Sequence, residues 1–401
     1  MTQTREDVAR LFTEVLDPVN RPDPYPLYAR MRETPVAPLA DGFWAVSTHE
    51  EITALLHHPG VSKEQGRSSV GGRPRSQGPT PFLFLDPPQH DRLRRLVMRR
   101  FTPARIAGMH VRVVALVGAL LDAQRGHDQF DVVDDFAYPL PVTVICELLG
   151  VPREDEQRFH VWADVLAHNL DPDPGQETIS GVVTAQQELV AYIGDLVAER
   201  RAHPSDDLLS ELAVGDDPAG RLADPDLIAT MILLLIAGHE TTVNLITNGV
   251  LTLLRHPEEL ERLRRDPVRA VHVVEELLRY EPPVQFAARY ALTDIELAGA
   301  TIPRGAGIRL MLAAGNRDPR VVPEPDRFDP GRGEPRHLGF GGGVHYCVGA
   351  PLARLEAQVA LTEVARRVVA PRLLQDPPPY RPNAVLRGPL HLPVGFAETV
   401  A

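Results

Sequence analysis

The sequence predicts a mainly α-helical protein with small β-sheets, and three observations favour this fold class. Between residues 109 and 255, apolar residues recur at three- and four-residue spacing, which is typical of helices with a buried face. One apolar stretch continues to Leu254 and is long enough for a helix of about 45 Å that would cross the molecule. After Pro283 the pattern changes to short apolar segments, which are typical of strands.

The predicted elements follow the chain in order. In the amino-terminal part, short helices alternate with strand-like segments such as 43–46. Helices are expected at 109–123, 137–149, 154–168, 177–201, 225–255, 267–280 and 351–369. Strands are expected at 284–291, 296–298, 308–312 and 390–396. The 401 residues contain 43% hydrophobic residues, no internal repeat and no long linker, so we expect a single domain over residues 1–401.

Composition excludes several classes of protein. The formal net charge of −12 argues against nucleic acid as a partner. The first residues contain no apolar signal region or membrane anchor, and Cys146 and Cys347 cannot form a disulfide framework. We therefore expect a soluble, cytoplasmic, bacterial-type protein that is a monomer and does not bind membranes. Lys63 is the only lysine among 42 basic residues, so any basic surface consists of arginine.

A glycine-rich segment around Cys347 gives the clearest sign of function. Glycines at 341–343 permit backbone angles and close approaches that a side chain would block, and Gly349 allows a helix to start beside the cysteine. Backbone N–H groups around the sulfur could then stabilise a thiolate held against a flat cofactor. The alternative is a free structural cysteine beside a flexible loop.

Phe340, Gly343, Cys347 and Gly349 match the haem-thiolate signature of the cytochrome P450 superfamily, which this segment resembles. The resemblance covers nearly the whole chain and is to soluble, actinobacterial-type members. It implies haem b (iron protoporphyrin IX) with Cys347 as the iron ligand, and Phe340, Gly343 and Gly349 around the cofactor. It also implies a triangular helical prism with a long central helix.

The expected central helix carries a polar interruption. Residues 227–238 are apolar on every side, but His239, Glu240, Thr241 and Thr242 follow, so burial in protein is favoured over a membrane span. This segment resembles the family's oxygen-activation motif, which implies that Glu240 is its acid and Thr241 its alcohol. The alternative is a polar cluster with satisfied hydrogen bonds in the core.

Glu276 and Arg279 fit the family's Glu-x-x-Arg motif by position, ahead of the Pro282-Pro283 break. The spacing alone is not specific, because such a pair is usually an exposed helix contact worth about 0.2 to 0.5 kcal/mol. Arg327 resembles the third member of the family's ion network. We expect Glu276, Arg279 and Arg327 to form a structural network behind the cysteine loop.

Four basic side chains are candidates for the two haem propionates. His90 and Arg94 lie four residues apart at the start of an expected helix, and arginine can bond both oxygens of a carboxylate. Arg289 and His345 resemble the family's other propionate partners. For each residue taken alone, a surface charge is the alternative.

A run of arginines without acidic residues follows His90. Its members are Arg92, Arg94, Arg95, Arg99, Arg100, Arg105 and Arg112. We expect this segment to lie on the thiolate side of the haem, where it could steer an acidic ferredoxin or flavodoxin. A solvated helix face is the alternative.

The resemblance implies a monooxygenase that inserts one oxygen atom of O2 into a hydrophobic small molecule, with electrons from an NAD(P)H-dependent reductase. A macrolide or polyketide, terpenoid or steroid-like substrate in secondary metabolism is expected. A peroxide-driven enzyme and a non-catalytic haem sensor or carrier are the alternatives. The pocket candidates by resemblance are Phe82, Leu83, Phe84, Leu233, Ile236, Ala237, Val284, Gln285, Phe286, Leu390 and His391.

Overall fold

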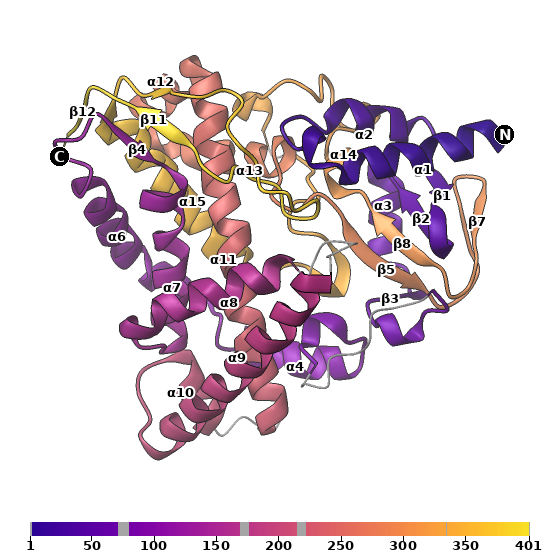
Figure 1. Cartoon of the computed structure of the whole chain (residues 1–401), viewed down its shortest axis with the longest axis horizontal. Helices are drawn as coiled ribbons and strands as arrows, with labels where there is room; N and C mark the ends of the chain where they lie inside the picture. The colour runs from indigo at the N-terminus through magenta and orange to yellow at the C-terminus, as the bar shows by residue number, and fades with distance from the viewer. Residues whose placement is uncertain (1, 71–79, 169–175, 215–221, 334, 401) are drawn as a thin grey trace.

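The computed structural model describes residues 2–70, 80–168, 176–214, 222–333 and 335–400. Its outline in Figure 1 is roughly triangular, with the two ends of the chain at different corners. Helices fill the larger part, and the longest sheet lies beside the N-terminal helices. The structure therefore has the fold class predicted from the sequence, mainly α with small sheets.

Helices account for most of the ordered elements. Their bounds are α1 Thr2–Leu16, α2 Tyr25–Arg32, α3 His49–Leu56, α4 Gln89–Met98, α5 Pro103–Gly108, α6 His110–Asp122, α7 Pro139–Leu149, α8 Glu156–His168, α9 Gln176–Ala202, α10 Leu208–Val214, α11 Asp224–Arg255, α12 Pro257–Arg265, α13 Ala270–Tyr280, α14 Leu312–Asn316 and α15 Ala350–Arg367. The seven helices predicted from apolar spacing are all present within a few residues of their predicted ends. A π-helix, Val133–Ala137, precedes α7.

Helix α11 is the central helix of the fold. It packs against α7, α8, α9 and α15, and most of its side chains are buried. Its length and composition, like those of the segment Pro103–Asp122, would allow it to cross a membrane. This is a weak indication, because a buried core helix has the same properties, and 56% of the most apolar window of α11 is buried in protein.

The principal sheet has five strands in the order β1-β2-β8-β5-β3. The strands of the four sheets are β1 Val36–Pro38, β2 Phe43–Val46, β3 Val61–Ser62, β4 Gln129–Asp131, β5 Ala287–Ala291, β6 Ile295–Leu297, β7 Ala300–Ile302, β8 Gly307–Leu310, β9 Val368–Val369, β10 Arg372–Leu373, β11 Pro393–Gly395 and β12 Glu398–Thr399. Strand β5 pairs antiparallel with both β8 and β3, so residues 61–62 lie beside residues 290–291.

Three hydrophobic clusters determine which side chains remain available for a site. The largest surrounds α11 and includes parts of α6, α7, α9, α13 and α15. A second lies between the principal sheet and α3, and a third joins α1 and α2 to Phe286, Met311 and neighbouring residues. The third cluster shows that the segment after Pro283 also serves the N-terminal core.

Candidate functional site

The loop before Cys347 has a backbone that requires glycine. Gly341 and Gly343 have φ angles of 68° and 63°, in the left-handed region. A Cβ atom at Gly343 would also lie 2.1 Å from the carbonyl oxygen of Leu56, so no side chain fits there. The N–H of Cys347 donates to the carbonyl of Phe340 at 3.1 Å, which closes the loop.

Cys347 lies just before the first turn of α15. Burial raises the pKa of its thiol, whereas the N–H groups of Gly349 and Ala350 and the charge of Arg94 favour the thiolate. A cation bound to the sulfur would stabilise the thiolate further, so the Cys347 thiol would lose its proton. The other cysteine, Cys146, is buried in the core, where burial raises its pKa to about 12, so it is an inert thiol.

Three residues outside the expected set support this loop. Arg354 of α15 donates to Glu275 of α13 at 2.6 and 2.9 Å, and its guanidinium lies 4.5 Å from the centre of the Phe340 ring. His337 contacts the same carboxylate at 3.0 Å. The acid therefore ties the loop to two helices. Burial favours the neutral acid, but the bonds from Arg354 and His337 outweigh it and lower the pKa of Glu275 to about 2.

One face of α11 is open although the helix lies at the centre of the molecule. Leu233, Ala237 and Thr241 follow one another at four-residue spacing and are half-buried or exposed, whereas their neighbours on the helix are mostly buried. The Thr241 hydroxyl donates to the carbonyl of Ala237 at 2.8 Å. A threonine bonded in this way can release its hydroxyl to another acceptor with little change in the helix.

Glu240 points to a different element from Thr241. Its carboxylate accepts a hydrogen bond from Arg381 at 2.6 Å, and both side chains are almost buried. Arg381 lies in the segment after α15, far from Glu240 in sequence. No sequence motif predicted that it would contact Glu240. Glu240, the acid expected from the sequence, therefore forms an ion pair with Arg381.

The structure brings three of the four expected propionate partners together. The His90 and His345 rings lie 4.3 Å apart, and Arg289 is one of the cations that depress the pKa of His345. Arg94, four residues after His90 on α4, donates to the carbonyl of Tyr346 at 2.6 Å, between His345 and Cys347 in sequence. It therefore connects α4 to the cysteine loop.

The unsatisfied groups in this cluster are those that an anion would satisfy. Within the described residues, His90 Nε2 and His345 Nδ1 are buried without a hydrogen-bond partner. Arg289 is 7% exposed, and its Nη1 donates to the carbonyl of Ala288 at 2.8 Å. Since buried cations require compensation, these residues fit the two carboxylates of a haem, with Cys347 available for its iron.

The ion network corrects one sequence prediction. Glu276 and Arg279 are buried and form two hydrogen bonds at 2.7 and 2.8 Å. The third member is Arg332, whose Nε donates to Glu276 at 3.0 Å. The prediction of Arg327 was wrong, because its side chain is 62% exposed beside Glu324 and only its carbonyl accepts a bond from Arg279.

Two pocket candidates after Pro283 serve the core instead. Gln285 is buried, its Nε2 donates to the carbonyl of Pro282, and its Oε1 accepts from the Tyr28 hydroxyl. Phe286 packs edge-on against Phe12 with ring centres 5.7 Å apart, in the N-terminal cluster. Side chains alternate in an extended segment, so the neighbouring Val284, which is half-buried, keeps its place as a candidate.

Leu390 and His391 are exposed side chains near the end of the chain. They are 41% and about 50% exposed, and His391 contacts Asp131 and Asp134 at the edge of β4. By contrast, the turn formed by Phe82, Leu83 and Phe84 contacts α11, and Phe82 packs near His90. This turn and the open face of α11 are the parts of the predicted pocket that lie together.

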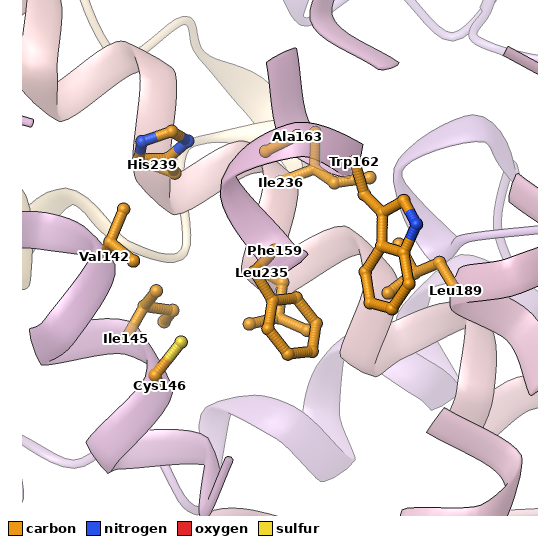
Figure 2. Close-up of a pocket in the computed structure, with 10 residues that line it drawn as sticks. All are labelled: Val142, Ile145, Cys146, Phe159, Trp162, Ala163, Leu189, Leu235, Ile236 and His239. Carbon is orange, nitrogen blue, oxygen red and sulfur yellow. The ribbon is translucent and has the colours of Figure 1, made fainter. Parts of the chain in front are cut away.

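A separate apolar pocket occupies the other side of α11. It is small, with a cavity volume of about 10 Å³, and lies between α7, α8, α9 and α11 (Figure 2). Ile236, which was predicted to line the substrate pocket together with Ala237, lines this separate pocket. The other lining residues are Val142, Ile145, Cys146, Phe159, Trp162, Ala163, Leu189, Leu235 and His239.

The arginine run is less positive than its sequence indicates. Arg92 pairs with Asp226, Arg105 with Glu211 at 2.6 Å, and Arg112 with Glu147. Arg100 lies 3.6 Å from the same Glu211. These acids come from later helices and neutralise much of the run. Arg95 of α4 and Arg99, directly after this helix, have exposed side chains, and so do Val344 and Tyr346 of the cysteine loop.

The comparisons with known proteins agree with this geometry. The cytochrome P450 family model matches residues 42–391. PikC, a cytochrome P450 monooxygenase of Streptomyces venezuelae, is 40% identical over 389 residues, which cover 93% of this chain and 91% of PikC. The 6-deoxyerythronolide B hydroxylase of Saccharopolyspora erythraea is 39% identical over 391 residues, which cover 93% and 96%. Ligand-free CYP164A2 of Mycobacterium smegmatis has a TM-score of 0.91 at 43% identity, covering 96% of this chain and 100% of that one.

The chain belongs to the cytochrome P450 family and is a monooxygenase whose cofactor is haem b. Members of this family use O2, a hydrophobic substrate and redox partners. The helical fold expected from the resemblance is therefore confirmed.

Proposed function

We propose that this protein is a haem-thiolate monooxygenase that oxidises a hydrophobic secondary metabolite of macrolide or polyketide, terpenoid or steroid-like type. The open face of α11 carries the proposal. It presents apolar Leu233 and Ala237 in line with the Thr241 hydroxyl, on a helix that is otherwise largely buried. An apolar wall next to one polar group suits a hydrophobic substrate positioned beside an oxygen site. Homologues in macrolide and polyketide biosynthesis support the class.

Each residue has a proposed role. Cys347 binds the iron, and His90, Arg94, Arg289 and His345 bind the propionates. When bound, the haem supplies the activation of O2 and the insertion of one oxygen atom into the substrate. Thr241 holds a hydrogen bond and a proton at its Oγ1, and Glu240 exchanges protons at its carboxylate.

Arg381 orients Glu240 in this proposal. Its guanidinium donates to the Glu240 carboxylate at 2.6 Å and so fixes the position of the acid that precedes Thr241 on α11.

Electrons would enter on the side of Cys347. The exposed Arg95 of α4 and Arg99 directly after it offer a basic surface that suits an acidic ferredoxin or flavodoxin, and Val344 and Tyr346 of the cysteine loop add exposed apolar side chains. An NAD(P)H-dependent reductase would supply that partner. We further propose that the protein works as a cytoplasmic monomer.

Spectral binding and turnover test this function. Compounds of the three substrate classes are screened for a shift of the haem absorption band, and ligands that bind are incubated with NAD(P)H, surrogate ferredoxin and reductase. Oxygenated product that requires this electron chain supports the proposal. Product from peroxide alone favours the peroxide-driven alternative, and tight binding without turnover by either route favours a sensor or carrier.

The Cys347→Ala variant tests the assignment of Cys347 as the iron ligand. It should lose the red-shifted carbon monoxide band of thiolate-bound ferrous haem, and Cys146→Ala should keep it because that thiol is buried in the core. If Cys347→Ala keeps the band, the assignment of the ligand is wrong.

A further inference from the structure

Two cations lie close together at the edge of the principal sheet. Strands β3 and β5 pair Val61 with Ala291 and Ser62 with Tyr290. Lys63 directly follows β3, and its Nζ donates to the same carbonyl, that of Ala288, as Nη1 of Arg289 on β5, so the two cations lie close together. Like charges held this close repel each other. An anion between them would reverse the sign of that effect.

Neither cation has a carboxylate partner among the described residues. Lys63 Nζ donates to the carbonyl of Ala288 at 3.3 Å, and Arg289 Nη1 donates to the same carbonyl at 2.8 Å. Burial lowers the pKa of both groups, that of Arg289 to about 10, and the charge of Arg289 lowers the pKa of Lys63 further. Both groups are therefore held in a position that is unfavourable for their charge.

Asp86 is the neighbouring acid, but its oxygens serve other donors. Its Oδ2 accepts from the Ser62 hydroxyl and from Arg67 at 3.1 Å, and its Oδ1 accepts the backbone N–H of Lys63 at 2.9 Å. These bonds fix the backbone at Lys63, so the acid orients the lysine without neutralising it. Residues 71–79, between Lys63 and Asp86, contain no Asp or Glu.

The same two cations extend the cluster built by His90 and His345. The Lys63 ammonium lies 5.6 Å from the centre of the Phe84 ring, and Phe82 of the same turn lies 6.2 Å from the His90 ring, which is 4.3 Å from the His345 ring. The two imidazole rings carry buried nitrogens without a partner. Four basic side chains from four elements thus converge, and only Lys63 had no assigned role.

We propose that Lys63 is a haem-propionate ligand that acts together with Arg289. The inference rests on the haem position in the proposed function. An ammonium on a flexible stem suits this place, because it can follow a carboxylate without the fixed planar geometry of a second guanidinium. The Lys63 ammonium also lies 5.6 Å from the centre of the Phe84 ring, so it joins the cofactor edge to the turn formed by Phe82–Phe84.

The test measures retention of haem by the holoenzyme. Haem transfer to excess apomyoglobin is followed by absorbance for the wild type, Lys63→Met, Lys63→Arg and Arg304→Gln. Lys63→Met should lose haem about tenfold faster, as expected for one lost charge-assisted hydrogen bond. Lys63→Arg keeps the charge but has the planar geometry of a second guanidinium, so its rate should lie between those of the wild type and Lys63→Met. Arg304, on an exposed turn near the same sheet, is the matched charge control and should show no change.

A haem without carboxylates shows whether Lys63 acts through the propionates. When the proteins are reconstituted with iron protoporphyrin dimethyl ester, which has no carboxylates, the wild type and Lys63→Met should lose it at equal rates. A tenfold difference that persists with the ester would overturn the proposal, because it would show general damage to the fold. Far-UV circular dichroism of both proteins before transfer checks folding independently.

Equal retention of native haem by the wild type and Lys63→Met would also overturn the proposal. In that case a myristate titration asks whether Lys63 binds the carboxylate of a substrate instead. Failure of the proposed function looks different, because the wild type itself would then lack the thiolate-type carbon monoxide band.

Discussion

The ion network behind the cysteine loop gives the sharpest stability prediction. Arg332→Ala removes the bond from Nε to Glu276 at 3.0 Å and the bonds from Nη1 to Pro323 O at 2.8 Å and from Nη2 to Arg327 O at 2.9 Å. A hydrogen bond to a charged group contributes about 1.5 to 3 kcal/mol, and unpaired buried acceptors add to the loss. Because Arg279 still compensates Glu276, we expect a loss of about 2 to 4 kcal/mol in the free energy of unfolding.

Arg327→Ala is the matched control. It deletes the same side chain five residues earlier, but this guanidinium is 62% exposed and pairs with an exposed glutamate at 3.4 Å. Such a substitution changes stability by about 0.5 kcal/mol or less. The carbonyl of Arg327, which accepts bonds from Arg279 and Arg332, is unaffected by the substitution.

Urea unfolding followed by circular dichroism gives the two free energies. The carbon monoxide band of each variant shows whether the cysteine loop is intact at zero denaturant. Equal losses for the two variants, or a larger loss for Arg327→Ala, would refute the assignment of Arg332 as the third member of the network.

Three further predictions concern catalysis, electron transfer and pH. Thr241→Ala should retain haem and substrate but divert NAD(P)H to peroxide or water, with about tenfold less product; unchanged coupling would remove the hydroxyl from the mechanism. Reversing Arg95 and Arg99 to Glu should slow ferredoxin-supported reduction but not dithionite reduction, and the same pair of changes at Arg153 and Arg158 should have no effect. Because the pKa of Glu275 is lowered from 4.5 to about 2, its stabilising effect is complete above pH 4.5 and falls as the pH drops towards 2. The stability difference between the wild type and Glu275→Gln in urea should therefore shrink over that range, and a constant difference would contradict the assigned bonds.

The sequence alone predicted the helical framework well, because helix formation depends on neighbours three and four residues away. The 225–255 prediction coincides with α11 to within a residue, since its apolar pattern needs no distant partner to be recognised. The segment 284–291 shows the limit of such patterns. Strand β5 begins only at Ala287, because the preceding residues join the N-terminal core through Gln285 and Phe286.

The cysteine loop was also determined locally. Gly341 and Gly343 have positive φ angles, which glycine adopts readily. The glycines in the motif therefore predict the loop conformation without information from distant residues. What the sequence could not give was the layer behind it. Arg354, Glu275 and His337 meet from three separate segments, and nothing in their local sequence indicates the contact.

Charge pairing was decided by tertiary structure alone. Arg327 and Arg332 have the same side chain in one short segment, and only the path of the chain after α14 turns Arg332 towards Glu276. Arg381 meets Glu240 across 141 residues, and Lys63 and Arg289, far apart in sequence, donate to the same carbonyl. Sequence supplies the type and number of charges. Their partners follow from how elements pack, because electrostatic and hydrogen-bond energies depend on distances of a few ångströms that spacing along the chain does not set.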